Sequence, residues 1–226
     1  MTTLASTVRS VLLSASEIGS PHKLRRDSIL FRQDQDGMGV FLIDAGLVKL
    51  TRTSNDGSKL ILSVLGPHQL LGDECLMQGS GKYFAEYACV TDVSGFHVPL
   101  SALRRLITVP ELAISFLSYV LARNREFGHK VEMLALRDVE HRILYGLATL
   151  AALVKPNGNG ASYPIPMTQA ELASFVGATR ETTSTTLSLL KNRHLVSLSR
   201  RLITTVHPDL LIKAANERMV QVKAAS

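Results

Sequence analysis

The chain has 226 residues, of which 46% are hydrophobic and 19% are charged, enough for one large or two ordinary domains. No apolar run approaches the roughly 18 residues that a membrane-spanning helix needs, and the first 20 residues lack the features of a secretory signal. We therefore expect a cytoplasmic protein without a membrane partner. Cys75 and Cys89 are too few for a disulfide framework, so we expect two reduced, packed thiols.

The net charge of +6 is unevenly distributed. Residues 138–226 carry 10 Lys and Arg against 6 Asp and Glu, a net of +4, whereas residues 1–137 carry a net of +2. The more cationic C-terminal part suits a polyanionic partner, although an ordinary solvated surface explains so small an excess nearly as well.

Short apolar runs separated by turn sequences fill residues 28–99. Asn55-Asp56-Gly57, between "LVKLTRT" and "KLILSVL", is a strong hairpin signal. Strands at this spacing are typical of an antiparallel sandwich or barrel, and we assign residues 1–110 to a β-barrel sensor domain.

The pattern changes at Pro110, a good first residue for a long helix over residues 111–137. Its apolar positions are spaced 3, 4, 3, 4 and 3 residues apart, with one Asn among them, which is typical of a coiled-coil seam that pairs two chains. The predicted dimer interface consists of Leu117, Val120, Asn124, Phe127, Val131 and Leu134. The alternative is a long helix that packs against its own barrel.

A second helix, "VEHRILYGLATLAALV", follows, and a loop with three prolines over residues 155–166 separates it from the C-terminal region. Within that loop, Ser162–Ile165 can form a short extended piece. We assign residues 138–226 to a winged-helix DNA-binding domain, which gives an α+β chain overall.

The segment from Thr168 reads as two short helices joined by a tight turn. Thr168 and Glu171 form the sequence signature of a capping box. Gly177 permits the left-handed backbone of the turn, and Thr179 can cap a second helix that runs to about Asn192.

The stretch "GATRETTSTTL", where the second helix begins, contains five threonines, although threonine is a mediocre helix former. The predicted inner face of this helix consists of Thr183, Leu187 and Leu190, and its predicted outer face of Arg180, Glu181, Ser184, Thr185 and Ser188. In a DNA major groove, Arg can grip guanine and Glu can accept from cytosine, while short hydroxyls approach phosphates closely. We therefore predict that Arg180 and Glu181 read bases, and that Ser184 and Thr185 tune specificity.

Two β-rich runs around Arg200-Arg201 predict a hairpin wing with a basic tip. Helix, turn, helix and basic hairpin in this order indicate binding to double-stranded DNA. A purely structural helical bundle is the alternative.

Residues 24–210 resemble the CRP/FNR family of bacterial transcription regulators. The resemblance depends on "LFRQDQDGMGVFLIDAGLVKLTRTSNDGSKLILSVLGPHQLLGDECLM", which looks like a cyclic-nucleotide-binding-type barrel, on the long helix, and on "TQAELASFVGATRETTSTTLSLLKNRHLV". It implies a homodimer that places two recognition helices in successive major grooves, with RNA polymerase as a candidate partner.

The resemblance also assigns roles on the DNA side. Arg180 and Glu181 match the family's base-reading pair, but Thr185 stands where members commonly have a second cation, and His194 stands where they often have Gly. The positions that match phosphate contacts are Thr168, Gln169, Thr179, Thr182 and Arg201.

The sensor matches nucleotide-binding relatives less well. Those carry a "GE" pair and, some ten residues later, an "RS" pair that cradle ribose and cyclic phosphate. This chain has Gly72-Asp73 and Tyr83-Phe84 instead. The candidate effector pocket consists of Gly72, Asp73, Cys75, Lys82, Tyr83, Phe84 and Phe127. Lys82 is a point charge and no bidentate fork, so we do not expect tight binding of cyclic AMP.

Several alternatives stay open for the sensor. The pocket can take a cyclic nucleotide or another small ligand, or the aromatics can fill it in a constitutively active dimer. Two cysteines cannot hold an iron–sulfur cluster, and His22, His68 and His97 form no metal or haem signature, so we expect neither cofactor. Cys75 leaves room for a thiol sensor.

Two other classes of function compete with a DNA-binding regulator. A cupin-like enzyme needs clustered metal ligands, and "GPHQLLGDE" offers one His without a His-x-His partner, so we expect no enzyme. A nucleotide-binding module whose helical end binds protein is the second rival.

Overall fold

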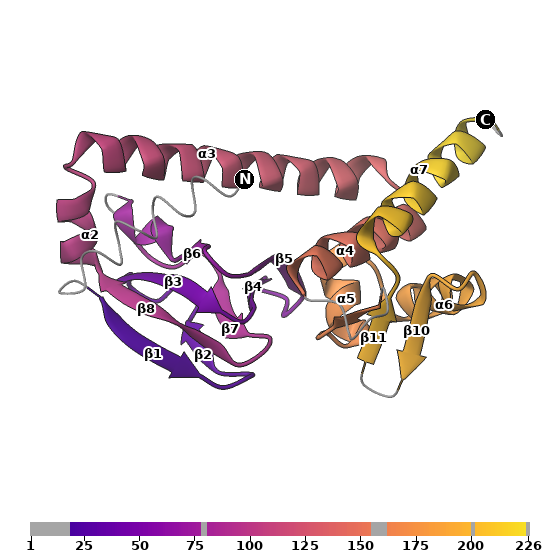
Figure 1. The fold of residues 1–226 in the computed structure, drawn as a ribbon, viewed down its shortest axis with the longest axis horizontal. Coiled ribbons are helices and arrows are strands. Elements are labelled where there is room, and N and C mark those ends of the chain that lie inside the picture. The colour runs from indigo at the N-terminus through magenta and orange to yellow at the C-terminus, as the bar shows by residue number, and fades with distance from the viewer. Residues whose placement is uncertain (1–18, 78–80, 155–161, 200–201, 225–226) are drawn as a thin grey trace. The chain divides into compact units, whose positions relative to one another are not determined.

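The structure is a computed structural model that describes residues 19–77, 81–154, 162–199 and 202–224. The chain divides into two compact units at His129 and Lys130, and each is described by itself. The long helix α3 (Pro110–Leu136) is continuous across that division (Figure 1). It begins at the predicted proline. Among the described residues, no single helix has the length and hydropathy to cross a membrane. The preceding helix α2 (Leu100–Leu106) and α3 pass that test together, but they are bent by 112° at their junction.

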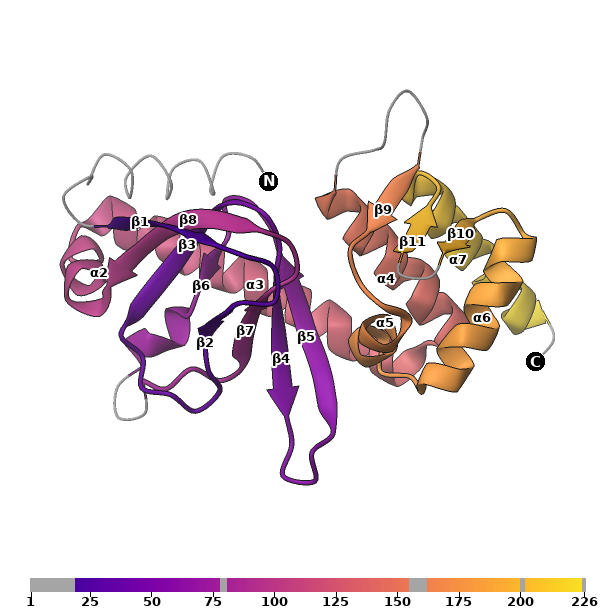
Figure 2. The same cartoon turned by 90° about the horizontal axis from the view of Figure 1, so that it is seen from below.

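The first unit is built on two four-stranded antiparallel sheets (Figure 2), which agrees with the predicted fold class. One sheet has the order β1 (Ser20–Leu24), β8 (Val93–Pro99), β3 (Gly39–Ala45) and β6 (Leu70–Leu71). The other has the order β2 (Ile29–Phe31), β7 (Glu86–Cys89), β4 (Val48–Thr53) and β5 (Lys59–Leu65).

The predicted hairpin joins β4 to β5. Thr53 pairs with Lys59, and the turn between them contains Gly57 at a φ of 84°, which glycine adopts without strain. Asp56 fixes this turn because its carboxylate accepts from the Ser58 backbone N–H at 3.0 Å.

Apolar residues of both sheets form one core. Removing each such side chain from water contributes roughly 1.5–3 kcal/mol. The core includes Val40, Leu42, Leu50, Leu65, Leu71, Tyr87 and Val98. Two short elements that the sequence analysis did not single out add to it: α2 (Leu100–Leu106) through Ala102 and Leu103, and the 3-10 helix η1 (Asp73–Leu76) through Cys75.

The second unit contains α4 (Val139–Leu153), α5 (Gln169–Val176), α6 (Arg180–Asn192) and α7 (Pro208–Ala224), with a three-stranded antiparallel sheet. The sheet has the order β10 (Val196–Ser199), β11 (Leu202–Thr205) and β9 (Tyr163–Ile165). The predicted short extended piece is therefore β9, and the predicted hairpin wing is β10 and β11. The tip of that wing, with Arg200 and Arg201, lies outside the described residues.

The core of this unit lies where α4, α5 and α6 meet the sheet. It includes Ile143, Leu147, Ile165, Leu172, Leu187, Leu190 and Ile203. The helix α7, which the sequence analysis did not predict, packs along α4. His141 of α4 is buried there, with its Nδ1 3.1 Å from the Ala215 carbonyl oxygen.

Candidate DNA-recognition surface and sensor interior

The helix–turn–helix begins with the predicted capping box. The Thr168 hydroxyl accepts from the Glu171 backbone N–H at 3.2 Å, and the Glu171 carboxylate accepts from the Thr168 N–H at 2.8 Å. These bonds satisfy backbone donors that the first turn of a helix leaves without partners. Gly177, at a φ of 63°, ends α5. The Thr179 hydroxyl then accepts from the Thr182 N–H at 3.1 Å and starts α6.

The helix α6 has one buried face and one solvent face, as the sequence predicted. The buried residues are Thr183, Thr186, Leu187 and Leu190. On the other face, Arg180, Glu181, Thr185 and Ser188 are exposed and Ser184 is half-buried. Within the described residues, neither Arg180 nor Glu181 has an ion-pair partner, so both charged groups are available to a ligand. Leu189, 52% exposed, is an apolar residue on this helix that the prediction did not include.

The threonines of α6 have several distinct roles. Thr179 caps the helix, and the Thr186 hydroxyl donates to the Thr182 carbonyl at 2.9 Å. Thr183 is fully buried, and its hydroxyl has no hydrogen-bond partner among the described residues. Of the four threonines within α6, Thr182 and Thr185 are exposed to solvent.

The end of α6 is held by two features. His194 takes the left-handed conformation, with a φ of 58°, in the position where the resemblance puts Gly. The Arg193 guanidinium donates to the Glu140 carboxylate of α4 at 2.7 Å. An ion pair to the neighbouring helix therefore fixes the C-terminal end of α6.

Four of the five predicted phosphate contacts lie on the described part of the chain. Thr168, Thr179 and Thr182 are exposed, and Gln169 is half-buried at the start of α5. The Thr179 and Thr182 hydroxyls lie 2.8 Å apart. Their contact with phosphate stays a prediction.

In the sensor, the Tyr83 ring fills the space beside Gly72. A Cβ on Gly72 would lie 2.7 Å from Tyr83 Cε1, and the Tyr83 ring stacks on Phe31 at 4.1 Å between centroids. The Tyr83 hydroxyl donates to the Gly39 carbonyl at 2.8 Å and accepts from the Met38 N–H at 3.1 Å. The ring is thus fixed at both ends, as expected if an aromatic occupies the pocket.

Phe84 does not fill the pocket, contrary to the alternative in which the aromatic residues together occupy it. It is 58% exposed, and its ring lies 4.7 Å from the Arg52 guanidinium carbon. The two residues lie at a bend just before β7, where Tyr83 is buried and Phe84 is exposed. Lys82 is also exposed, and its ammonium lies 3.9 Å from the Asp36 carboxylate.

The predicted pocket residue Asp73 pairs with a cation of the long helix. Arg123, buried in the middle of α3, donates to the Asp73 carboxylate at 2.5 Å and to the Leu70 carbonyl at 3.3 Å. One turn earlier, the Tyr119 hydroxyl donates to the Leu70 carbonyl and accepts from the Leu70 N–H, both at 2.9 Å. The sequence analysis missed Arg123 and Tyr119. A charged residue between apolar helix positions was the available signal.

A second acid, Glu74, is satisfied by the protein as well. Its carboxylate accepts from the Tyr87 hydroxyl at 2.6 Å and from the Phe84 N–H at 3.0 Å. Cys75, next in the chain, is buried, and this burial raises the pKa of its thiol to about 11. The neutral thiol therefore dominates at neutral pH, which disfavours the thiol-sensor alternative.

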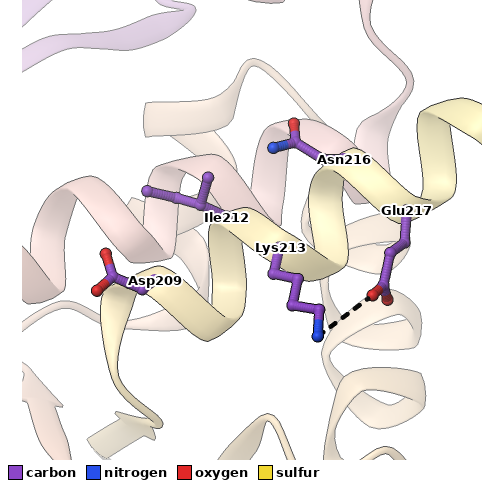
Figure 3. Close-up of a pocket in the computed structure, with 5 residues that line it drawn as sticks. All are labelled: Asp209, Ile212, Lys213, Asn216 and Glu217. Carbon is purple, nitrogen blue, oxygen red and sulfur yellow. Dashed lines mark ion pairs between the residues drawn. The ribbon is translucent and has the colours of Figure 1, made fainter.

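A shallow cavity of about 470 Å³ lies along α7 (Figure 3). It is lined by Asp209, Ile212, Lys213, Asn216 and Glu217, all from that one helix. Lys213 and Glu217 form an exposed ion pair at 3.9 Å across its rim. The lining is one exposed helix face and has no converging buried polar group.

Comparison with known proteins places both units in known classes. A model of the cyclic nucleotide-binding domain matches residues 21–109, and a model of the Crp-like helix-turn-helix domain matches residues 141–214. The two units therefore define a DNA-binding transcription regulator with a cyclic-nucleotide-binding-type sensor.

Curated relatives extend the match along the chain. The global nitrogen regulator of Synechococcus elongatus is 26% identical over 89% of this chain and 95% of its own. The cAMP-activated global transcriptional regulator CRP of Haemophilus influenzae is 27% identical over 77% of this chain and 79% of its own.

Solved structures show the same fold. FixK2 from Bradyrhizobium japonicum has a TM-score of 0.75 at 18% identity, over 87% of this chain and 96% of its own. A regulator of the CRP/FNR family from Thermus thermophilus has a TM-score of 0.74 at 20% identity, over 87% of this chain and 98% of its own. The chain belongs to the CRP/FNR family of transcription regulators, whose members are DNA-binding proteins and not enzymes.

Proposed function

We propose that this regulator is a homodimer that reads a palindromic DNA site with α6, in the cytoplasm, and without control by cyclic AMP. RNA polymerase is the further partner that we expect at a promoter. The observation that carries the proposal is the free solvent face of α6, where Arg180 and Glu181 stand on a helix held at both ends.

The dimer is supported by an exposed apolar stripe on α3. Leu117 and Val131 are 57% and 64% exposed, and Leu121 is 57% exposed. Of the predicted seam, Val120, Phe127 and Leu134 are partly covered by their own chain. The stripe that we now propose consists of Ile114, Leu117, Leu121, Asn124, Gly128 and Val131, again 3 or 4 residues apart.

The base-reading assignment rests on chemistry and exposure. An exposed Arg180 can donate twice to guanine, and Glu181 can accept from cytosine, each good pair contributing about 1–3 kcal/mol of discrimination. Ser184 and Thr185 follow one turn later and tune the neighbouring positions. Thr168, Gln169, Thr179, Thr182 and Arg201 set the register on the backbone.

The sensor residues do not fit a cyclic nucleotide. The Tyr83 ring stands beside Gly72, and the buried cation Arg123 is neutralised by Asp73. A cyclic phosphate buried there would need a cation and hydrogen-bond donors that the protein already uses for itself. Although the Haemophilus influenzae relative is named as cAMP-activated, we expect this chain to bind DNA without added nucleotide.

Selection of bound sequences from random duplexes tests the proposal. The purified protein is expected to enrich an inverted repeat, with half-sites about one helical turn apart, equally with and without cyclic AMP. Failure to enrich any sequence would contradict DNA reading by α6. Enrichment that requires cyclic AMP would contradict the account of the sensor but not DNA reading by α6.

A further inference from the structure

The C-terminal end of α5 is held by two cations. The last carbonyls of a helix have no partner within it and carry its negative dipole end. Lys130 Nζ donates to the Phe175 carbonyl, and Arg142 Nη1 donates to the carbonyls of Val176 and Gly177, both at 2.9 Å. Three successive carbonyls at the turn of the helix–turn–helix are therefore satisfied from α3 and α4.

Lys130 is more closely fitted than a surface lysine. Its ammonium lies 3.6 Å from the centroid of the Phe175 ring, a cation–π contact on a buried side chain. One turn further along α3, Leu134 lies against the turn, because a Cβ on Gly177 would be 2.7 Å from Leu134 Cδ2. The last turns of α3 thus contact both the backbone end of α5 and the glycine that follows it.

The held carbonyls are close in the chain to the recognition helix. Only Ala178 and Thr179 separate Gly177 from Arg180, the first residue of α6. A shift of the Phe175–Gly177 backbone must therefore move the N-terminal end of α6, where the proposed base-reading residues stand. Among the described residues, the contacts of Lys130 are with Phe175 of α5 and not with the solvent face of α6.

We propose that Lys130 is a positioning residue for DNA recognition, which fixes the turn of the helix–turn–helix from the end of the dimer helix and does not itself touch DNA. The inference deepens the proposed function and rests on it. It gives the last turns of α3 a part in placing Arg180 and Glu181.

The first test compares the affinity of variants for two duplexes, one selected by the wild type and one with a scrambled sequence. Lys130→Met is expected to bind the selected duplex about tenfold more weakly and the scrambled duplex as the wild type does. The dependence of affinity on salt concentration should not change. Loss of a phosphate contact lowers the slope of log affinity against log salt by about one, whereas loss of a positioning contact leaves it unchanged. Lys130→Arg, which keeps the cation over the ring, should recover most of the affinity.

The control is Lys213→Met, which removes the same charge from an exposed position on α7. Its side chain is 73% exposed and pairs only loosely with Glu217 among the described residues, so neither duplex should be bound differently. Wild-type affinity of Lys130→Met, or an equal loss on both duplexes with a reduced salt slope, would overturn the proposal.

A second test does not depend on DNA. Hydrogen exchange of peptides that cover residues 173–183 should be several-fold faster in Lys130→Met than in Lys213→Met, while peptides of the β-sheet core exchange equally. Unchanged exchange in that segment would overturn the proposal even if no duplex were available. If the wild type selects no duplex but this exchange increases, the proposed function fails while the Lys130 contact stands.

Discussion

The sensor interior and the solvent face of α6 are both rich in polar side chains, but these groups have different partners. In the sensor, Arg123 pairs with Asp73, Tyr87 with Glu74, and Tyr83 with the Gly39 backbone. On α6, Arg180 and Glu181 extend into solvent. Polar groups that satisfy one another leave little for a ligand, whereas exposed and unpaired groups are available to one. This difference indicates that the C-terminal unit is the one that recognises a polar partner.

The largest effect is expected from breaking the buried pair in the sensor. Arg123→Met removes a buried guanidinium and leaves the half-buried Asp73 without its cation, which should lower the free energy of unfolding by about 3 kcal/mol. Urea denaturation measures this loss. As a control, Lys82→Met removes the exposed contact to Asp36 and should change stability by less than about 0.5 kcal/mol. Equal effects of the two variants would show that the sensor interior is not held by its own ion pair.

A smaller effect concerns pH and Lys130. Burial beside Arg142 lowers the pKa of Lys130 from its ordinary 10.5 to about 8 in the folded state. Between pH 8 and 10.5 the unfolded chain therefore binds more protons at this residue than the folded chain does. The contribution of Lys130 to the free energy of unfolding therefore increases as pH rises through this range.

Comparing the unfolding free energy of the wild type with that of Lys130→Met at several pH values isolates this contribution. The wild type should gain roughly 1–3 kcal/mol relative to the variant as pH rises through this window. A difference that stays constant, or falls, would contradict the burial of this ammonium.

Threonine hydroxyls in and next to α6 differ in their structural role, and the Thr179 cap can be compared with the exposed Thr185. Thr179→Ala removes the acceptor for the Thr182 N–H and should cost about 1 kcal/mol, whereas Thr179→Ser should keep nearly all of it. Thr185→Ala, at an exposed position inside the helix, should be neutral or slightly stabilising because alanine has the higher helix propensity. Thermal unfolding compares the three variants. A cost at Thr185 as large as at Thr179 would contradict this division of roles.

The smallest effect is expected at Thr183. Its buried hydroxyl has no partner among the described residues, so Thr183→Val, which keeps the shape and removes the hydroxyl, should raise stability by up to about 1 kcal/mol. Denaturation in urea measures the gain. A clear loss would mean that the hydroxyl has a partner, such as water, that stabilises the fold.

Local chemistry made much of the second unit predictable. Thr168 with Glu171, then Gly177, then Thr179 are signals whose meaning depends only on neighbouring residues, and each has the predicted backbone role. The hairpin at Asp56-Gly57 was predictable for the same reason. The pairing of Arg123 with Asp73 was not, because it joins residues that are 50 positions apart.

The long helix and the sensor show where sequence patterns were insufficient. Leu117 with Leu121, and Val120 with Phe127, are both helix-face spacings, and only the packing of the first unit decides which set its own chain covers. Tyr83 and Phe84 were treated as one aromatic pair, although the bend before β7 buries the first and exposes the second. Lys130 was missed because its partners are a backbone carbonyl and an aromatic ring of another helix, which a sequence pattern does not reveal.

The most direct test of the account is the base preference of Arg180→Ala. Duplexes selected by the wild type should be compared with duplexes in which one base pair of each half-site is changed, with affinity measured by fluorescence anisotropy. The account predicts that the variant loses about 1–3 kcal/mol of discrimination at one base pair per half-site and keeps its preference elsewhere. An unchanged preference at every position would show that α6 does not read the DNA through Arg180.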